Sequence, residues 1–125
     1  MEVYALALKE NNEIQGLVGI RKDVEACAAY IHWACVAPHN NKQEFGIQKY
    51  TGVGAHLFAI AADKSMQWGY GGTMYGFATN RKLLSHYIEK FQAEYLGIVH
   101  QYQFMIDEYH AGQLLEVYHY EWNET

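Results

Sequence analysis

Two glycines separated by one residue, Gly52 and Gly54, stand where a polar loop gives way to an amphipathic run. The stretch that carries them reads Lys49-Tyr50-Thr51-Gly52-Val53-Gly54-Ala55. Glycines that open a helix directly after a strand let the backbone approach a ligand closely and point free N–H groups at it. This geometry suits an anion, most often a phosphate, and the basic loop of residues 42–49 is sufficient for one small polyanion.

The glycine stretch matches neither of the two common phosphate-binding loops. The Walker pattern requires Lys followed by Ser or Thr after its glycines, and the dinucleotide fingerprint requires a third glycine. A glycine pair at this spacing is more often only a tight connection between a strand and a helix, with no ligand. The surrounding sequence therefore has to decide between these two interpretations.

The composition of the chain limits the classes of protein to consider. Its 125 residues are half hydrophobic with one proline, which predicts a single domain over residues 1–125 with a substantial core. The net charge of −5 argues against a general nucleic-acid binder, because no basic stripe is available to neutralise phosphates. The first apolar run, residues 3–8, is too short for a signal peptide or a membrane span.

The cysteines and histidines suggest neither a disulfide nor a metal site. Cys27 and Cys35 are interpreted as buried reduced thiols, and a cytoplasmic location follows as the default. Six histidines are scattered without an acidic third ligand at close spacing, so no metal is expected. They are His39, His56, His86, His100, His110 and His119.

The first third of the chain predicts three strands, at residues 3–9, 14–21 and 26–37. Asn11-Asn12 between the first two predicts a hairpin turn, since Asn tolerates positive φ. Pro38 and the polar residues after it end the third strand by turn chemistry. These runs together predict an antiparallel meander.

The remainder of the chain alternates helical and extended patterns. Helical spacing predicts a helix over residues 53–68, closed by the glycines at 69–72. A buried strand at 73–79 follows, and Asn80 is well placed as the N-cap of a second helix. Two further strands are predicted at residues 101–106 and 113–122. The complete order of elements is then β-β-β-α-β-α-β-β. This order predicts an α/β (α+β) fold with a mixed, mostly antiparallel sheet and helices on its faces.

The order of elements and three motifs resemble the GCN5-related N-acetyltransferase (GNAT) superfamily over residues 3–122. Val36-Ala37-Pro38 is similar to the end of the central strand of that fold. The stretch from Lys49 to Gly54 is similar to its acyl-CoA pyrophosphate loop. Asn80 and, seven residues later, Tyr87 are similar to the asparagine and tyrosine that flank the pantetheine arm and the thiol.

The resemblance implies a site for acetyl-CoA between the third and fourth strands of this chain. Backbone groups of Cys35, Val36 and Ala37 would pair with the pantetheine amides. The pyrophosphate would bind backbone N–H groups from residues 50–55, aided by the dipole of the following helix. Lys49 or Lys42 would add charge-assisted bonds. The donor is then acetyl-CoA, and the acceptor is a small-molecule, protein or peptide amine.

Acetyl transfer to an amine needs a neutral nucleophile, a polarised carbonyl and a proton for the leaving thiolate. Tyr87 is the candidate acid, with a core tyrosine as the alternative. His32 is the candidate base because its ordinary pKa lies near neutrality, and Glu25 is the second candidate. A satisfied strand histidine is the alternative interpretation of His32.

The sequence departs from the GNAT pattern in ways that leave its function open. Lys49 stands where Arg or Gln is usual, and the fold's first strand and first two helices have no counterpart before Val3. An N-acetyltransferase is therefore weighed against a non-catalytic acyl-CoA-binding module and a purely structural dimerisation domain. Without these N-terminal elements, a sheet edge and apolar surface would be exposed to water. We therefore predict a homodimer that covers them.

Overall fold

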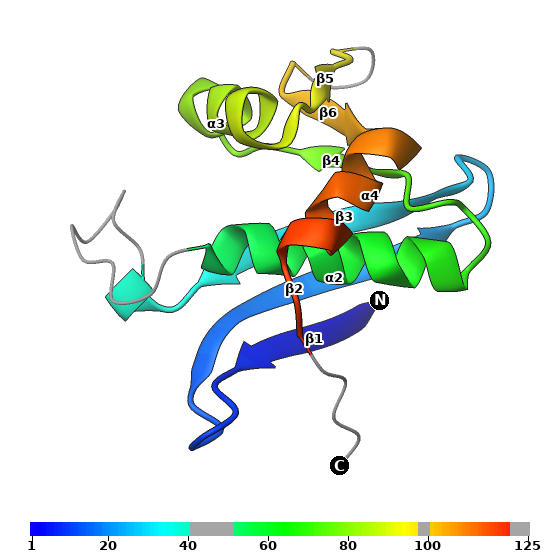
Figure 1. Cartoon of the computed structure of the whole chain (residues 1–125). Coiled ribbons are helices and arrows are strands. Elements are labelled where there is room, and N and C mark those ends of the chain that lie inside the picture. Colours follow the sequence, from blue (N-terminus) through cyan, green and yellow to red (C-terminus); the bar gives the residue numbers. More distant parts are fainter. Residues whose placement is uncertain (41–51, 98–100, 121–125) are drawn as a thin grey trace.

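The computed structural model describes residues 1–40, 52–97 and 101–120, which form one six-stranded sheet and three α-helices (Figure 1). The sheet order is β1-β2-β3-β4-β6-β5; β3 and β4 pair in parallel and every other pair is antiparallel. This confirms the predicted mixed, mostly antiparallel sheet. The elements are β1 (Glu2–Ala7), β2 (Ile14–Asp23), β3 (Ala28–Val36), the 3₁₀ turn η1 (Pro38–Asn40), α2 (Val53–Gln67), β4 (Met74–Phe77), α3 (Arg81–Phe91), β5 (Glu94–Tyr95), β6 (Gln103–Ile106) and α4 (Glu108–Val117).

The predicted meander of β1, β2 and β3 is confirmed. Asn12 adopts φ 60° in the first hairpin, the left-handed conformation that asparagine tolerates. The second turn contains Cys27 at φ 52°, and this cysteine is exposed, as is Cys35 on β3. The prediction of buried thiols is therefore wrong: one cysteine lies in a turn, and the other lies on a face of the sheet that the described helices leave uncovered.

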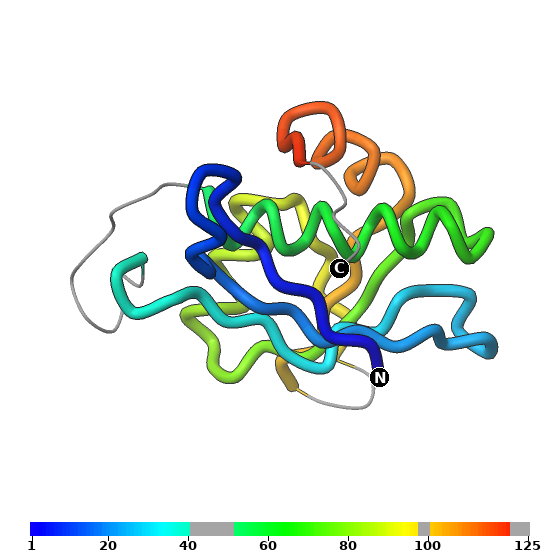
Figure 2. The backbone as a smooth tube through the Cα atoms, turned by 90° about the horizontal axis from the view of Figure 1, so that it is seen from below, coloured from blue at the N-terminus to red at the C-terminus, as the bar shows by residue number. Residues whose placement is uncertain are grey.

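Helix α2 is the centre of the core, because it lies between the sheet and α4 (Figures 1 and 2). Both the predicted helix and its glycine-rich end are confirmed, with Gly69, Gly71 and Gly72 at positive φ. Gly16 of β2 lets the helix approach, since a Cβ there would lie 3.1 Å from side-chain atoms of Val53 and Leu57. A helix covered on two sides needs apolar residues all round, and α2 has them.

Helix α3 packs on the same face of the sheet as α2 through a cluster of aromatic rings. The ring of Phe58 on α2 lies 4.9 Å from Tyr87 and 4.8 Å from Phe91, and 6.1 Å from Phe104 of β6. The predicted N-cap is confirmed, since Asn80 Oδ1 accepts a hydrogen bond from the Leu83 N–H at 2.8 Å. The three described helices thus share one face of the sheet.

The prediction of a strand over residues 113–122 is wrong, because residues 108–117 form helix α4. Asp107 caps this helix by accepting the His110 N–H at 2.9 Å, and Ala111 and Leu114 are buried at helical spacing. The alternating tyrosines near the end of the chain are typical of a strand, but Tyr118 is the C-cap residue of α4, so the helix ends just before the alternation.

Within the described residues, no helix is long and apolar enough to cross a membrane.

Candidate functional site

Strands β3 and β4 separate part-way along their length. They pair over three positions only, from Ala29 opposite Met74 to Ile31 opposite Gly76. Strand β3 then continues to Val36 while pairing with β2 on its other side. The register between β2 and β3 shifts at the same place, with Gly19 opposite Trp33 but Ile20 opposite Ile31, so His32 is an extra, bulged residue.

The bulge determines which backbone groups of β3 face the gap between β3 and β4. The Ala37 N–H donates to the Gln15 carbonyl at 2.9 Å, so this group points toward β2. Because hydrogen-bonding direction alternates along an antiparallel strand, Cys35 points the same way, and Ala34 and Val36 point toward the gap. Of the three residues predicted to pair with a pantetheine arm, Val36 has the suitable orientation.

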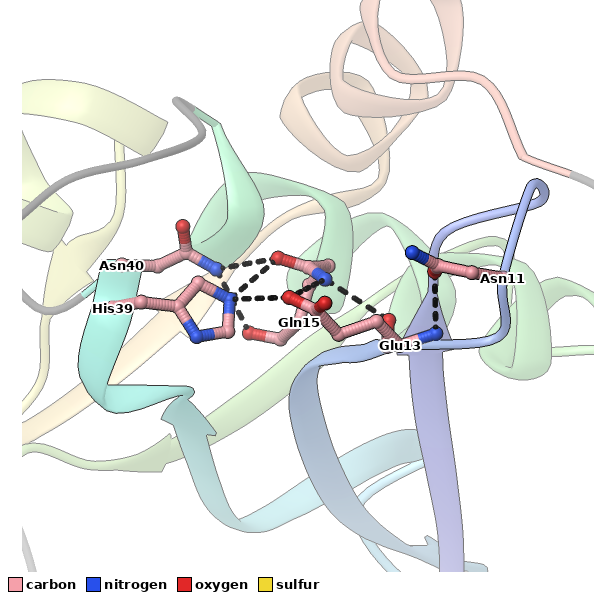
Figure 3. A network of polar contacts seen from close by, with 5 residues as sticks. All are labelled: Asn11, Glu13, Gln15, His39 and Asn40. Carbon is pink, nitrogen blue, oxygen red and sulfur yellow. Dashed lines mark hydrogen bonds and ion pairs between the residues drawn. The ribbon is translucent and has the colours of Figure 1, made fainter.

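A polar network fixes the point where the chain leaves β3 (Figure 3). The Gln15 Oε1 accepts hydrogen bonds from Asn40 Nδ2 at 2.9 Å and from His39 Nε2 at 2.8 Å. His39 Nε2 also lies 3.5 Å from a carboxylate oxygen of Glu13. Asn40 and Gln15 are both buried and their side-chain polar atoms have hydrogen-bond partners, so the turn η1 is held against β2.

Among the described residues, no side chain caps the N-terminus of α2. Gly52 is the N-cap at φ 75° and supplies no side-chain hydrogen bond to the first turn. A Cβ added at Gly54 would meet no described atom within 4 Å apart from its chain neighbours and the backbone of its own helix, so there is space beside the first turn. Val53 and Ala55 are buried, so their contribution toward a ligand is limited to backbone groups. The predicted residues Lys49, Tyr50 and Thr51 lie outside the described residues.

Asn80 and Tyr87 lie on α3, on the helical face of the sheet. The cap of α3 uses Asn80 Oδ1, so a contact with a ligand would come from its Nδ2. The Tyr87 ring is half-buried, 4.9 Å from Phe104, and burial raises its pKa to about 12. Tyr87 therefore keeps its proton throughout the neutral range, as a proton donor must.

Comparison with solved structures finds a crystal structure of a protein assigned as a streptothricin acetyltransferase from Bacillus anthracis, in complex with acetyl coenzyme A. The two chains are 21% identical, with a TM-score of 0.51 over 83% of this chain and 58% of the other. The fold is GNAT-like. No family model matches the sequence, and no curated protein matches it. The chain thus spans a little over half the length of this structural neighbour, and the likeness is one of fold.

In this GNAT-like fold, His32 lies on the face of the sheet opposite the helices. Its ring is 4.5 Å from that of Tyr30, and its pKa is lowered by burial, then by Arg21 and the N-terminal amino group. His32 and Tyr87 therefore lie on opposite faces of the sheet, with Tyr87 packed against Phe104 of β6. Glu25 is in the exposed turn between β2 and β3, at the other end of β3 from the gap.

The face that carries His32 also carries a cluster that sequence reasoning missed. Its rings are Tyr30 of β3 with Tyr75 and Phe77 of β4, and its charged groups are Arg21 and Asp23 of β2. The signal was present as two pairs of aromatic residues at a spacing of two, Tyr-x-His and Tyr-x-Phe. Among the residues that the structure describes, no group of His, Cys, Asp or Glu could hold a metal ion.

Proposed function

We propose that the protein is an acyl-CoA-dependent N-acyltransferase that moves an acetyl group from acetyl-CoA to a primary amine. One observation carries the proposal: the part of β3 beyond its pairing with β4 lies next to the N-terminus of α2, which no described side chain caps. Val36 pairs with Gly16, and Gly16 lies against Val53. The strand offers backbone groups that point away from β2 to an amide-bearing arm, and the helix offers N–H groups to a phosphate. Support comes from the fold of the acetyl-CoA-bound neighbour.

Each predicted residue has a role in this proposal. The Val36 backbone pairs with the pantetheine arm, and Cys35 and Ala37 hold this part of β3 against β2. The N–H groups of residues 53–55 bind the pyrophosphate, with Gly52 and Gly54 keeping the approach clear. Lys49, Tyr50 and Thr51 complete this loop, and Asn80 Nδ2 contacts the arm from α3.

The reaction proceeds by direct transfer in a ternary complex. The amine nitrogen attacks the thioester carbonyl carbon, a C–N bond forms, and the C–S bond breaks. His32 takes the proton from the amine nitrogen and passes it to water. Tyr87 gives its proton to the leaving thiolate and recovers one from water. The products are an amide and CoA, and no metal takes part.

A non-catalytic acyl-CoA-binding module is the second candidate. The observation that favours it is the face around His32, which none of the described helices covers. An acceptor site in an enzyme is normally concave. Such a module would bind acetyl-CoA but release no thiol when amines are added.

We also propose that the protein is a cytoplasmic homodimer. Met1, Val3 of β1 and Trp33 of β3 lie around Gly19 of β2 on the uncovered face and form an apolar patch, with exposures of 64, 51 and 38%. A monomer seldom leaves such a patch in water. Sedimentation at micromolar concentration should give twice the monomer mass, and Val3→Glu should give the monomer. A monomeric wild-type protein would refute this part of the proposal.

The main test combines calorimetry and enzyme assays. Acetyl-CoA and CoA are titrated into the protein, and thiol release is then followed with a panel of amines. We expect binding of both and thiol release that depends on the amine. His32→Gln should retain acetyl-CoA affinity and lose most of the turnover. No binding of acetyl-CoA would refute both candidates, and binding without thiol release for any amine would leave only the binding module.

A further inference from the structure

Four rings lie in contact beside the gap between β3 and β4. The rings of His32 and Phe77 are inclined to that of Tyr30 by 62° and 67°, and the ring of Tyr75 is tilted by 34°. We call this set, Tyr30, His32, Tyr75 and Phe77, the aromatic platform. The Tyr30 ring is at its centre, 4.5 Å from His32, 5.0 Å from Tyr75 and 5.8 Å from Phe77. Pairing of β3 with β4 ends at Ile31, so His32 marks the side of the platform that adjoins the gap.

Two charged residues, Arg21 and Asp23, border the platform, and the carboxylate of Asp23 already accepts hydrogen bonds within the protein. Asp23 accepts hydrogen bonds from the Tyr75 hydroxyl and from the Ala26 N–H. Its side chain is 17% exposed, whereas that of Arg21 is 52% exposed. The Arg21 guanidinium lies 5.2 Å from the Tyr30 ring centre and 4.0 Å from the carboxylate of Asp23.

We propose that the aromatic platform binds the acceptor, and that the acceptor is a planar aromatic amine bearing an anionic group. This inference rests on the proposed function and specifies its acceptor. The ring of such an amine stacks on Tyr30, its carboxylate pairs with Arg21, and its amino group lies toward His32 and the gap. Offset or edge-to-face contacts between aromatic rings supply the recognition.

The charges on this face disfavour a cationic alkylamine. Asp23 has its hydrogen bonds made within the protein, and Arg21 already occupies one side of the Tyr30 ring as a cation. The positive charges of Arg21 and the N-terminus also contribute to lowering the pKa of His32, which indicates a positive potential at this point. An ammonium group would have to enter against that potential.

An aromatic amine also fits the chemistry of the transfer. It is weakly basic and therefore neutral at physiological pH, so its nitrogen needs no deprotonation before attack. The nitrogen forms the C–N bond, the C–S bond breaks, and the proton that the nitrogen then releases goes to His32. The products are an N-acetyl arylamine and CoA.

The inference is tested first by direct binding to the protein without acetyl-CoA. The probes are 4-aminobenzoate, aniline and cyclohexylamine, and binding is followed by NMR shifts of the tyrosine and histidine ring protons. We expect affinity to fall in that order. Tyr30→Leu should weaken 4-aminobenzoate binding about threefold to tenfold, and Tyr95→Leu, an exposed tyrosine outside the platform, should not. Arg21→Gln should weaken it about twofold to fivefold and leave aniline unchanged, with Lys22→Gln as the matched control.

The same three amines are then compared as acceptors in the thiol-release assay. A lower KM for 4-aminobenzoate than for cyclohexylamine, raised by Arg21→Gln, supports the inference. Thiol release with cyclohexylamine alone, or a platform whose ring protons do not shift, overturns the inference and leaves the proposed function intact. Binding of 4-aminobenzoate to the platform of a protein that does not bind acetyl-CoA refutes the proposed function and retains the platform as a binding site.

Discussion

Gly54 allows the ligand-binding and stability effects of one substitution to be separated. Its φ is outside the left-handed region, and a Cβ there would meet no described atom within 4 Å apart from its neighbours and its own helix backbone. Gly54→Ala should therefore fold normally and gain about 0.4–1 kcal/mol in the free energy of unfolding, because alanine has less freedom than glycine in the unfolded chain. The added methyl group projects into the space where we place the pyrophosphate, so affinity should fall.

The expected loss of acetyl-CoA affinity follows from the hydrogen bonds to phosphate that the added methyl group would displace. A hydrogen bond to a charged group contributes about 1.5–3 kcal/mol, so displacing one phosphate contact weakens binding about 10-fold to 100-fold. Gly112→Ala is the control, since Gly112 is also helical, on α4, and an added Cβ would likewise meet no described atom within 4 Å outside its own helix. Thermal unfolding should show both variants stabilised by a few degrees. Calorimetry should show weaker acetyl-CoA binding for Gly54→Ala alone, and equal affinity in the two variants would refute the placement.

Three further substitutions test other parts of the structure. Tyr87→Phe should lower kcat with unchanged acetyl-CoA affinity; because burial raises the Tyr87 pKa to about 12, wild-type activity should not fall from loss of this proton below about pH 11. Gly19→Ala should cost about 1–3 kcal/mol of unfolding free energy and change tryptophan fluorescence, because its Cβ would lie 2.7 Å from the Trp33 ring. Tyr75→Phe removes the hydrogen bond that contributes most to lowering the Asp23 pKa. Since that stabilisation exists only above the folded pKa, this variant should be about 1 kcal/mol less stable at pH 7, and the difference should vanish as denaturant titrations are repeated toward pH 2.

Local sequence signals correctly predicted the elements whose conformation depends on residues close by in the sequence. The hairpin at Asn12, the helix after Gly52 and the cap at Asn80 depend on backbone and capping preferences that act within a few residues. Helix α4 was missed because its apolar residues, Ala111 and Leu114, become buried only when they reach α2. Capping by Asp107 was the one local indication, and a single Asp is too common to decide between a helix and a strand.

The uncovered face could not be predicted, because it depends on where the helices pack and not on the strands themselves. Alternation predicts that one face of β3 is apolar, but both faces of this strand carry large apolar or aromatic residues. Ile31 is buried under the helices, whereas Tyr30 points the other way. The interpretation of Cys35 as buried failed for the same reason.

The bulge at His32 connects the two halves of the proposed site. In a regular strand, His32 and Trp33 would point to opposite faces, but the extra residue places both on the uncovered face. The same shift turns the backbone of Val36 toward the gap, because the alternation of hydrogen-bonding direction changes by one residue. One inserted residue therefore aligns the donor side and the acceptor side at the point where β3 and β4 part. Deleting His32 should consequently affect both the binding of acetyl-CoA and the binding of an amine, whereas His32→Gln should leave acetyl-CoA binding intact.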